Sequence, residues 1–381
     1  MDELVVGTYE GFVLGYIPSP EENKLKQTFA TQSHTGSVRC LTTAGKFLAS
    51  GGTDDKIVVI DMKIRKEHTV LMHHDGTVNA LSFTHNGTHL ISGSDDGKLV
   101  VTRVGNWKIE KMWKKAHEGQ PVVSVAVHPS DKIALTIGGD KTLKTWNLIK
   151  GRPAFTINLA SKGISLATDI MFAPDSVRFT VISQQTVDVW KIDTAGIEKR
   201  ITCNSKPSTV QWLSQEKLII GLDNGNLLLL NISDSEAVTC SAHKQRVKCL
   251  TYDKNMLYSA SSSGEIKQWS LSESNNLTLE KTITASCRIT CMRLNKLSHL
   301  FKKEDKSDSE DNSDAEKSES ENENGEEAEV SDNSNDENEI VLKKRISYVT
   351  VNYDSEEEKD KEPPKKKGRK RNKKPKRKPS Q

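Results

Sequence analysis

No run of apolar residues in this 381-residue chain approaches the roughly 18 residues that a membrane-spanning helix needs. The first residues, Met-Asp-Glu-Leu-Val-Val-Gly, lack the basic start and long apolar stretch of a secretory signal peptide. We therefore expect a soluble intracellular protein without a membrane partner.

Cysteine is scarce as well, with six residues scattered along the chain. Only Cys287 and Cys291 lie close together, and a single C-x₃-C pair without a second pair is a poor zinc site. We expect reduced thiols in a cytosolic or nuclear protein and no bound metal.

Familiar catalytic motifs are also missing. The chain has no P-loop, no G-x-S-x-G elbow and no H-E-x-x-H helix. The stretch Gly-Gly-Asp-Lys-Thr at 138–142 lacks the spacing of a phosphate-binding loop and fits a turn between strands. We predict a protein that is not an enzyme and has no cofactor or small-molecule substrate.

What the chain does contain is a repeat of about 44 residues. Each copy holds short apolar or β-branched runs bounded by Gly, Asp or Asn, a pattern typical of strands. The pattern resembles the WD-repeat family, which predicts an all-β, seven-bladed WD40 β-propeller over residues 1–300. The expected ends of the seven third strands are Tyr16, Ile60, Thr102, Trp146, Trp190, Leu230 and Trp269.

The two ends of this region complement each other. Residues 4–16 align with residues 90–102, so the chain begins at the second strand of a blade. Residues 288–294 form an additional strand that can supply the missing first strand. Pairing the two segments closes the ring and leaves no open sheet edge. We predict a closing blade shared by residues 4–30 and 288–294.

His, Ser or Thr, Asp and Trp recur at fixed positions in several repeats. A hydrolase triad would occur once, whereas a recurring set indicates buried hydrogen bonds that fix each blade. Only the repeat ending at Trp146 keeps all four, and Ser263 stands at the Asp position of the repeat ending at Trp269. The predicted structural residues are His34, Ser50, Asp54, His74, Ser92, Asp96, His117, Thr136, Asp140, Trp146, His243, Ser259 and Trp269.

Residues 301–381 form a tail that is first acidic and then basic. Residues 304–339 include 17 acidic and two basic residues and almost no apolar ones, which predicts disorder. Residues 340–353 alternate like a strand; they are either a docking segment or a less polar part of the tail. Serines with an acid three positions later are candidate phosphorylation sites: Ser307, Ser313, Ser318, Ser320 and Ser355.

Residues 365–378 hold 11 basic residues in 14 positions. Such clusters serve nuclear import or bind nucleic acid through phosphates, so we predict nuclear and nucleolar targeting. Any contact with pre-rRNA would be independent of sequence, because no aromatic residue is interleaved to stack bases. The targeting residues are Lys365, Lys366, Lys367, Arg369, Lys370, Arg371, Lys373, Lys374, Lys376, Arg377 and Lys378.

Several stretches resemble one branch of the WD-repeat proteins. They include Glu-Leu-Val-Val-Gly-Thr-Tyr-Glu at 3–10, His-His-Asp-Gly-Thr-Val at 73–78 and Asp-Val-Trp-Lys-Ile-Asp-Thr-Ala at 188–195. The longest is His-Pro-Ser-Asp-Lys-Ile-Ala-Leu-Thr-Ile-Gly-Gly-Asp, which opens residues 128–154. Together they are similar to the PAK-interacting WD-repeat proteins, a nucleolar family with basic tails.

That resemblance implies two functions. The first is a nucleolar docking scaffold for pre-ribosomal assembly proteins in the maturation of the large ribosomal subunit. The alternative is a signalling regulator that binds the regulatory region of a PAK-type kinase and inhibits its activation.

Overall fold

The computed structural model describes residues 2–19, 25–233, 237–272 and 276–296. They belong to the first of two compact units, residues 1–307. The predicted targeting residues at 365–378, the five candidate phosphorylation serines and residues 340–353 lie outside the described residues. The described part contains 28 strands and one short 3₁₀ helix, η1 (Ala160–Lys162).

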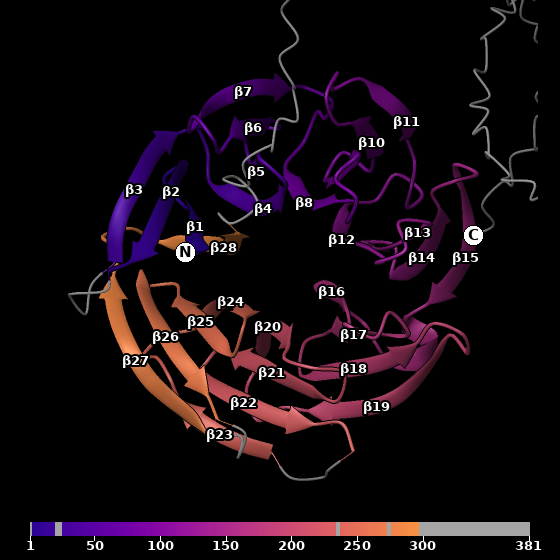
Figure 1. Cartoon of the computed structure of the whole chain (residues 1–381). Helices are drawn as coiled ribbons and strands as arrows, with labels where there is room; N and C mark the ends of the chain where they lie inside the picture. Colours follow the sequence, from indigo (N-terminus) through magenta and orange to yellow (C-terminus); the bar gives the residue numbers. More distant parts are fainter. Residues whose placement is uncertain (1, 20–24, 234–236, 273–275, 297–381) are drawn as a thin grey trace, which may run out of the picture. The chain divides into compact units, whose positions relative to one another are not determined.

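The strands form seven four-stranded antiparallel sheets arranged as the blades of a ring (Figure 1). This is the predicted seven-bladed propeller, and the third-strand positions named above all lie in the third strands. The strands of each blade are given from the innermost outward. Blade 1 consists of β28 (Ile289–Lys296), β1 (Asp2–Thr8), β2 (Phe12–Pro18) and β3 (Leu25–Gln32), and blade 2 consists of β4 (Val38–Ala44), β5 (Phe47–Gly52), β6 (Ile57–Asp61) and β7 (Lys66–Leu71). Blade 3 consists of β8 (Val78–Phe83), β9 (His89–Ser94), β10 (Leu99–Arg103) and β11 (Ile109–Trp113), and blade 4 consists of β12 (Val122–Val127), β13 (Ile133–Gly138), β14 (Thr142–Asn147) and β15 (Arg152–Asn158).

Blades 5 to 7 follow in the same order. Blade 5 consists of β16 (Asp169–Phe172), β17 (Arg178–Ile182), β18 (Thr186–Lys191) and β19 (Gly196–Thr202). Blade 6 consists of β20 (Pro207–Trp212), β21 (Lys217–Leu222), β22 (Asn226–Asn231) and β23 (Ala237–Ser241). Blade 7 consists of β24 (Val247–Asp253), β25 (Met256–Ser261), β26 (Glu265–Leu271) and β27 (Leu277–Thr284).

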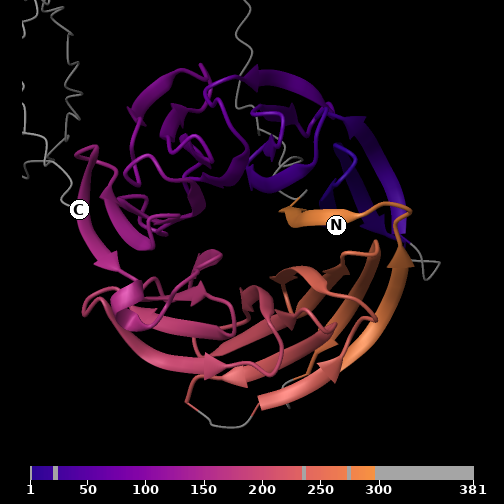
Figure 2. The same cartoon turned by 180° about the vertical axis from the view of Figure 1, so that it is seen from behind.

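The ring closes in blade 1, where the two ends of the propeller meet. Strand β28 pairs with β1 in a register that places Leu4 opposite Leu294 and Gly7 opposite Cys291. Both views of the ring show the orange β28 beside the indigo β1 (Figures 1 and 2). The innermost strands then contact one another in an unbroken circle from β28 through β4 to β24 and back to β28.

The hydrophobic core lies between the blades. Seven clusters of buried residues each draw on two neighbouring blades, so every blade shares a core with the blade on either side. All five residues of β6 are buried, because a middle strand is covered on both faces by adjacent blades. Seven shared cores for seven blades are possible only in a closed ring. Each fully buried Leu, Ile or Val adds about 1.5–3 kcal/mol.

Close approach between blades depends on a recurring glycine. A Cβ added to Gly51 in β5 would lie 2.6 Å from a methyl carbon of Val78, the first residue of the next inner strand. The same added atom on Gly93 would lie 2.5 Å from Val122. These positions accept no side chain without separating the blades, which explains the glycine within the repeated Ser-Gly pair.

Three tryptophans outside the third-strand position also pack between blades. Trp107 contacts Phe47 of the preceding blade at a ring separation of 5.1 Å, and Trp113 lies 4.7 Å from Trp146 of the next blade. Trp212 is buried in the core shared by blades 5 and 6. Among the described residues, no helix is long and apolar enough to cross a membrane.

Candidate docking surface

Four side chains in blade 4 form one buried chain of hydrogen bonds. Trp146 Nε1–H donates to Thr136 Oγ1 at 2.8 Å, and Thr136 Oγ1 lies 2.7 Å from His117 Nε2. His117 Nδ1 lies 2.9 Å from Asp140 Oδ1. With the tryptophan as the first donor, the Thr136 hydroxyl donates to Nε2 and Nδ1–H donates to the carboxylate, so the imidazole is neutral.

Blades 2 and 3 repeat this chain without the tryptophan. The third-strand position carries Ile60 or Thr102 there in place of tryptophan. Among the residues that the structure describes, the hydroxyl of the second strand then has only the histidine as a side-chain partner. The contacts are His34–Asp54 (2.8 Å), His34–Ser50 (2.8 Å), His74–Asp96 (3.2 Å) and His74–Ser92 (2.8 Å).

Blade 7 corrects one detail of the sequence analysis. Trp269 Nε1–H donates to Ser259 Oγ at 2.9 Å, and Ser259 Oγ lies 2.8 Å from His243 Nε2. The carboxylate opposite His243 Nδ1 belongs to Glu265, at 2.6 Å, whereas the Ser263 hydroxyl bonds to another serine of the same turn. Blade 7 therefore has a complete chain of four, because the longer glutamate side chain reaches back from two residues farther along.

Blade 5 has a different buried polar contact, which the sequence analysis missed. Asp188 in β18 is fully buried and accepts hydrogen bonds from Arg200 in β19, Nε to Oδ1 at 2.7 Å and Nη2 to Oδ2 at 3.0 Å. Trp190 occupies the third-strand position, but its indole N–H has no acceptor among the described residues and its ring stacks on Phe179. The one sequence feature that could have indicated this contact is the single charged residue, Asp188, between two valines of an otherwise apolar strand.

The correction in blade 7 gives a first testable prediction. Glu265→Ala is expected to lower the free energy of unfolding by about 1 kcal/mol, because a partly exposed, charge-assisted hydrogen bond to His243 is lost. The control, Ser263→Ala, is expected to change it by less than about 0.5 kcal/mol. Urea denaturation of the two variants measures both values, and equal losses would contradict the assignment.

The buried histidines give a pH dependence. Burial is the main cause that lowers the pKa of His73, His74, His117 and His243 below the ordinary 6.5. The unfolded chain therefore binds protons first as the pH falls through 6.5, and the folded state loses stability. Each histidine contributes a slope of up to about 1.4 kcal/mol per pH unit.

The pKa shifts of the acidic residues determine the pH range in which the effect of the histidines can be measured. The acids of the hydrogen-bonded chains, such as Asp96 and Glu265, have a lowered pKa in the folded state. They therefore reduce the free energy of unfolding only when the pH falls below about their ordinary pKa values of 3.8 and 4.5. Burial raises the pKa of Asp169, so this one carboxyl group increases the free energy of unfolding as the pH falls. Its effect is opposite to that of the four histidines. The free energy of unfolding from urea titrations is expected to fall between pH 7.5 and pH 5.5; a rise over that interval would contradict the account.

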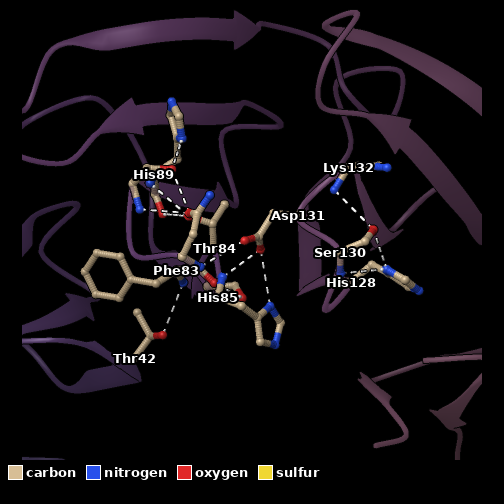
Figure 3. A network of polar contacts seen from close by, with 12 residues as sticks. Thr42, Phe83, Thr84, His85, His89, His128, Ser130, Asp131 and Lys132 are labelled. Atoms are coloured by element: carbon tan, nitrogen blue, oxygen red, sulfur yellow. Dashed lines mark hydrogen bonds and ion pairs between the residues drawn. The ribbon is translucent and has the colours of Figure 1, made fainter. Parts of the chain in front are cut away.

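The turns on one face of the ring form a connected rim. We call the turns that follow the inner strands β4, β8, β12, β16 and β20 the inner turns, residues 45–46, 84–88, 128–132, 173–177 and 213–216. Asp131 accepts the backbone N–H groups of His85 at 2.6 Å and Asn86 at 2.9 Å (Figure 3). The carboxylate of one blade thereby caps the inner turn of the blade before it.

Similar contacts join the neighbouring blades. The N–H of Phe83 donates to Thr42 Oγ1 at 3.3 Å, also visible in Figure 3. His128 Nε2–H donates to the carbonyl of Ser176 at 2.7 Å. Arg178 reaches the carbonyl of Gln215 at 3.1 Å. Four consecutive blade junctions are therefore linked on this face, and two of the contacts come from the His-Pro-Ser-Asp segment at 128–131.

A cavity of about 520 Å³ opens inside this rim. We call it the inner-turn cavity. Its walls come from blades 1 to 5 and include the hydroxyls of Thr42 and Ser82, apolar Met171, and the side chains of Arg293 and Asn295. Among the described residues, no group of three His, Cys, Asp or Glu side chains is placed to hold a metal ion.

Comparison with known proteins agrees with this fold. Residues 23–61, 65–102, 109–147 and 235–270 match the WD domain, G-beta repeat, family. Propellers of this family are typically protein-interaction folds rather than enzymes.

Individual relatives match about three quarters of the chain. The chain is 36% identical to the p21-activated protein kinase-interacting protein 1-like of Danio rerio, over 76% of this chain and 79% of that protein. It is 31% identical to Shk1 kinase-binding protein 15 of Schizosaccharomyces pombe, over 77% and 84%. It is 25% identical to protein MAK11 of Saccharomyces cerevisiae, over 76% and 82%. The chain therefore belongs to the WD-repeat family of the p21-activated protein kinase-interacting proteins.

Proposed function

We propose that this chain is a non-enzymatic docking scaffold of the nucleolus that gathers assembly proteins of the large ribosomal subunit. The observation that carries the proposal is its similarity, over about three quarters of the chain, to a family built on a protein-interaction fold. The segment at 128–131, which is part of the resemblance to nucleolar family members, contributes two of the four contacts that connect neighbouring blades at the inner turns.

The charged tail fits this location. The 11 basic residues within 365–378 would direct the chain to the nucleus and nucleolus, and could add sequence-independent contacts with pre-rRNA. Such contacts would weaken steeply as the salt concentration rises, because binding to phosphates releases counterions.

A second function is favoured by what the relatives are called. Two of them are named for interaction with a protein kinase, the p21-activated kinase in one case and Shk1 in the other. On this reading the propeller binds the regulatory region of a PAK-type kinase and prevents its activation.

Affinity purification separates the two functions. The full chain is purified from cells at moderate salt, with and without RNase, and its partners are identified by mass spectrometry. The scaffold predicts large-subunit assembly proteins that remain after RNase. Recovery of a PAK-type kinase without any pre-ribosomal protein would favour the regulator and reject the scaffold.

A chain that lacks residues 365–378 provides the matched test of targeting. We expect it to lose its nucleolar localisation in fluorescence microscopy, while a chain lacking the acidic residues 304–317 should retain it. Nucleolar signal that persists without residues 365–378 would contradict the targeting role.

A further inference from the structure

The face of the ring opposite the inner turns concentrates positive charge. We call it the entry face, because here the chain enters each inner strand. Lys206, Arg246 and Arg288 are the last residues before the inner strands of blades 6, 7 and 1. Their backbone carbonyls accept N–H groups from the turn between the second and third strands of the same blade, at 2.9, 3.1 and 2.8 Å. The three residues therefore have equivalent places on this face.

These three cations are neighbours around the ring. The inner strands of blades 6, 7 and 1 contact one another in turn, whereas blades 2, 3 and 4 carry the uncharged Ser37, Thr77 and Pro121 at the same position. Lys244, two residues before Arg246, adds another exposed cation to blade 7. We call four residues the basic arc: Lys206, Lys244, Arg246 and Arg288.

Little negative charge accompanies the basic arc. Arg246 pairs with Asp223 at 2.8 Å, and in the part of the chain that the structure describes no carboxylate forms an ion pair with the other three. Among the described residues of these turns, the one remaining acid is Glu10, and Glu265 at their edge is already bonded to His243. Three exposed cations are therefore left without an ion-pair partner.

The acids of the entry face lie mainly in other blades. Asp55, Asp75 and Asp95 belong to the corresponding turns of blades 2 and 3, where Asp75 is bonded to Lys98. The entry face is therefore polarised, and an anionic partner is attracted to blades 6, 7 and 1.

An exposed aromatic ring lies within the basic arc. The guanidinium of Arg288 lies over the ring of Tyr9, 4.9 Å from its centre. Tyr9 is 56% exposed, so its ring can also stack on a base. Proteins that bind single-stranded nucleic acid combine these two features, cations that follow the phosphates and aromatic rings that stack on bases.

An acidic protein segment fits the basic arc less well. The centre of a protein interface is usually apolar and rich in aromatic side chains. Among the described residues of these turns, Tyr9 is the one large apolar side chain that is exposed. The surface therefore offers charge and a single stacking platform, which suits a strand of regularly spaced phosphates.

We propose that the basic arc is an RNA-binding site of the propeller. A single-stranded segment places its phosphates against Lys206, Lys244 and Arg288 and stacks a base on Tyr9. The site consists of other residues than the basic cluster at 365–378, and it goes beyond the docking of proteins proposed above.

The test is fluorescence anisotropy with a fluorescein-labelled oligouridylate of about 12 nucleotides. The host is the full-length chain with amides in place of the 17 acidic residues of 304–339 and the 11 basic residues of 365–378. Charges of either sign on the same polypeptide would otherwise compete with the RNA or bind it themselves.

The triple variant Lys206→Gln, Lys244→Gln, Arg288→Gln is expected to raise the Kd at least about tenfold at low salt. It should also reduce the slope of log Kd against log salt by about 2, because each phosphate contact with a single strand contributes about 0.7. The matched control, Lys66→Gln, Lys111→Gln, Arg152→Gln, removes the same charge from the outer strands β7, β11 and β15. It should change the Kd by less than about twofold.

A second pair of variants tests the stacking. Tyr9→Ala is expected to raise the Kd about fivefold or more and to leave the salt slope unchanged, whereas Tyr9→Phe should bind as the host does. All variants should melt at the temperature of the host, because the replaced side chains are exposed.

Three outcomes would overturn the site. They are an unchanged Kd and salt slope in the arc variant, an equal loss in the outer-strand control, or displacement of the RNA by polyglutamate as effectively as by unlabelled oligouridylate. The last result would identify an acidic protein segment as the partner instead. The assay uses purified chain and RNA only, so its failure leaves the co-purification of assembly proteins as an independent test of the scaffold.

Discussion

A chain that lacks residues 288–294 is expected to lose more than about 5 kcal/mol of its free energy of unfolding. The deletion removes most of β28, including Ile289 and Met292, each only 1% exposed. Loss of a single large core side chain costs about 2–5 kcal/mol, and here two go together with a strand. The deletion also exposes the edge of β1, which invites pairing between chains.

Thermal unfolding followed by circular dichroism measures this effect. The transition is expected to move to much lower temperature and to broaden, and the truncated chain should aggregate. A deletion of equal length at 308–314, in the acidic part of the tail sequence, is the control and should melt as the intact chain does. A 288–294 deletion with the same melting temperature as the intact chain would show that the ring does not depend on its closing strand.

Thr136→Val is expected to cost about 3 kcal/mol, although threonine and valine have nearly the same shape. Thr136 is fully buried between Trp146 and His117, and within the described part of the chain its hydroxyl is the only hydrogen-bonding link between them. Removing it leaves an indole N–H and an imidazole nitrogen without partners, and each such buried group costs about 1–3 kcal/mol.

Ser50→Ala in blade 2 is the matched comparison. Its hydroxyl is equally buried but has only His34 as a side-chain partner in the described part of the chain, so we expect a loss of about 1–2 kcal/mol. Urea denaturation gives both values. If Thr136→Val cost no more than Ser50→Ala, the tryptophan would add nothing to the hydrogen-bonded chain.

Much of the ring could be predicted from the sequence because the repeat is local. Each blade needs four short strands and turns at fixed positions, so the same pattern of residues recurs along the chain. This repeat can be recognised in a single sequence. The closing strand was also predictable, since a chain that begins at a second strand needs a first strand from elsewhere. Structure and sequence place that strand within two residues of each other, 288–294 against Ile289–Lys296.

What the sequence did not predict depends on side-chain reach or on contacts between blades. Glu265 replaces an aspartate from two positions away, and alignment by fixed spacing selects Ser263 instead. The contacts of His128 and Asp131 join turns that are about 45 residues apart and meet only when the ring forms.

Measurement of rRNA precursors after depletion of this protein tests the central claim most directly. Northern blots before and after rapid depletion should show accumulation of large-subunit precursors, with small-subunit precursors unchanged. Expression of the full chain should reverse the accumulation, and expression of a chain without residues 365–378 should not. Normal large-subunit processing after complete depletion would contradict the proposed role in ribosome assembly.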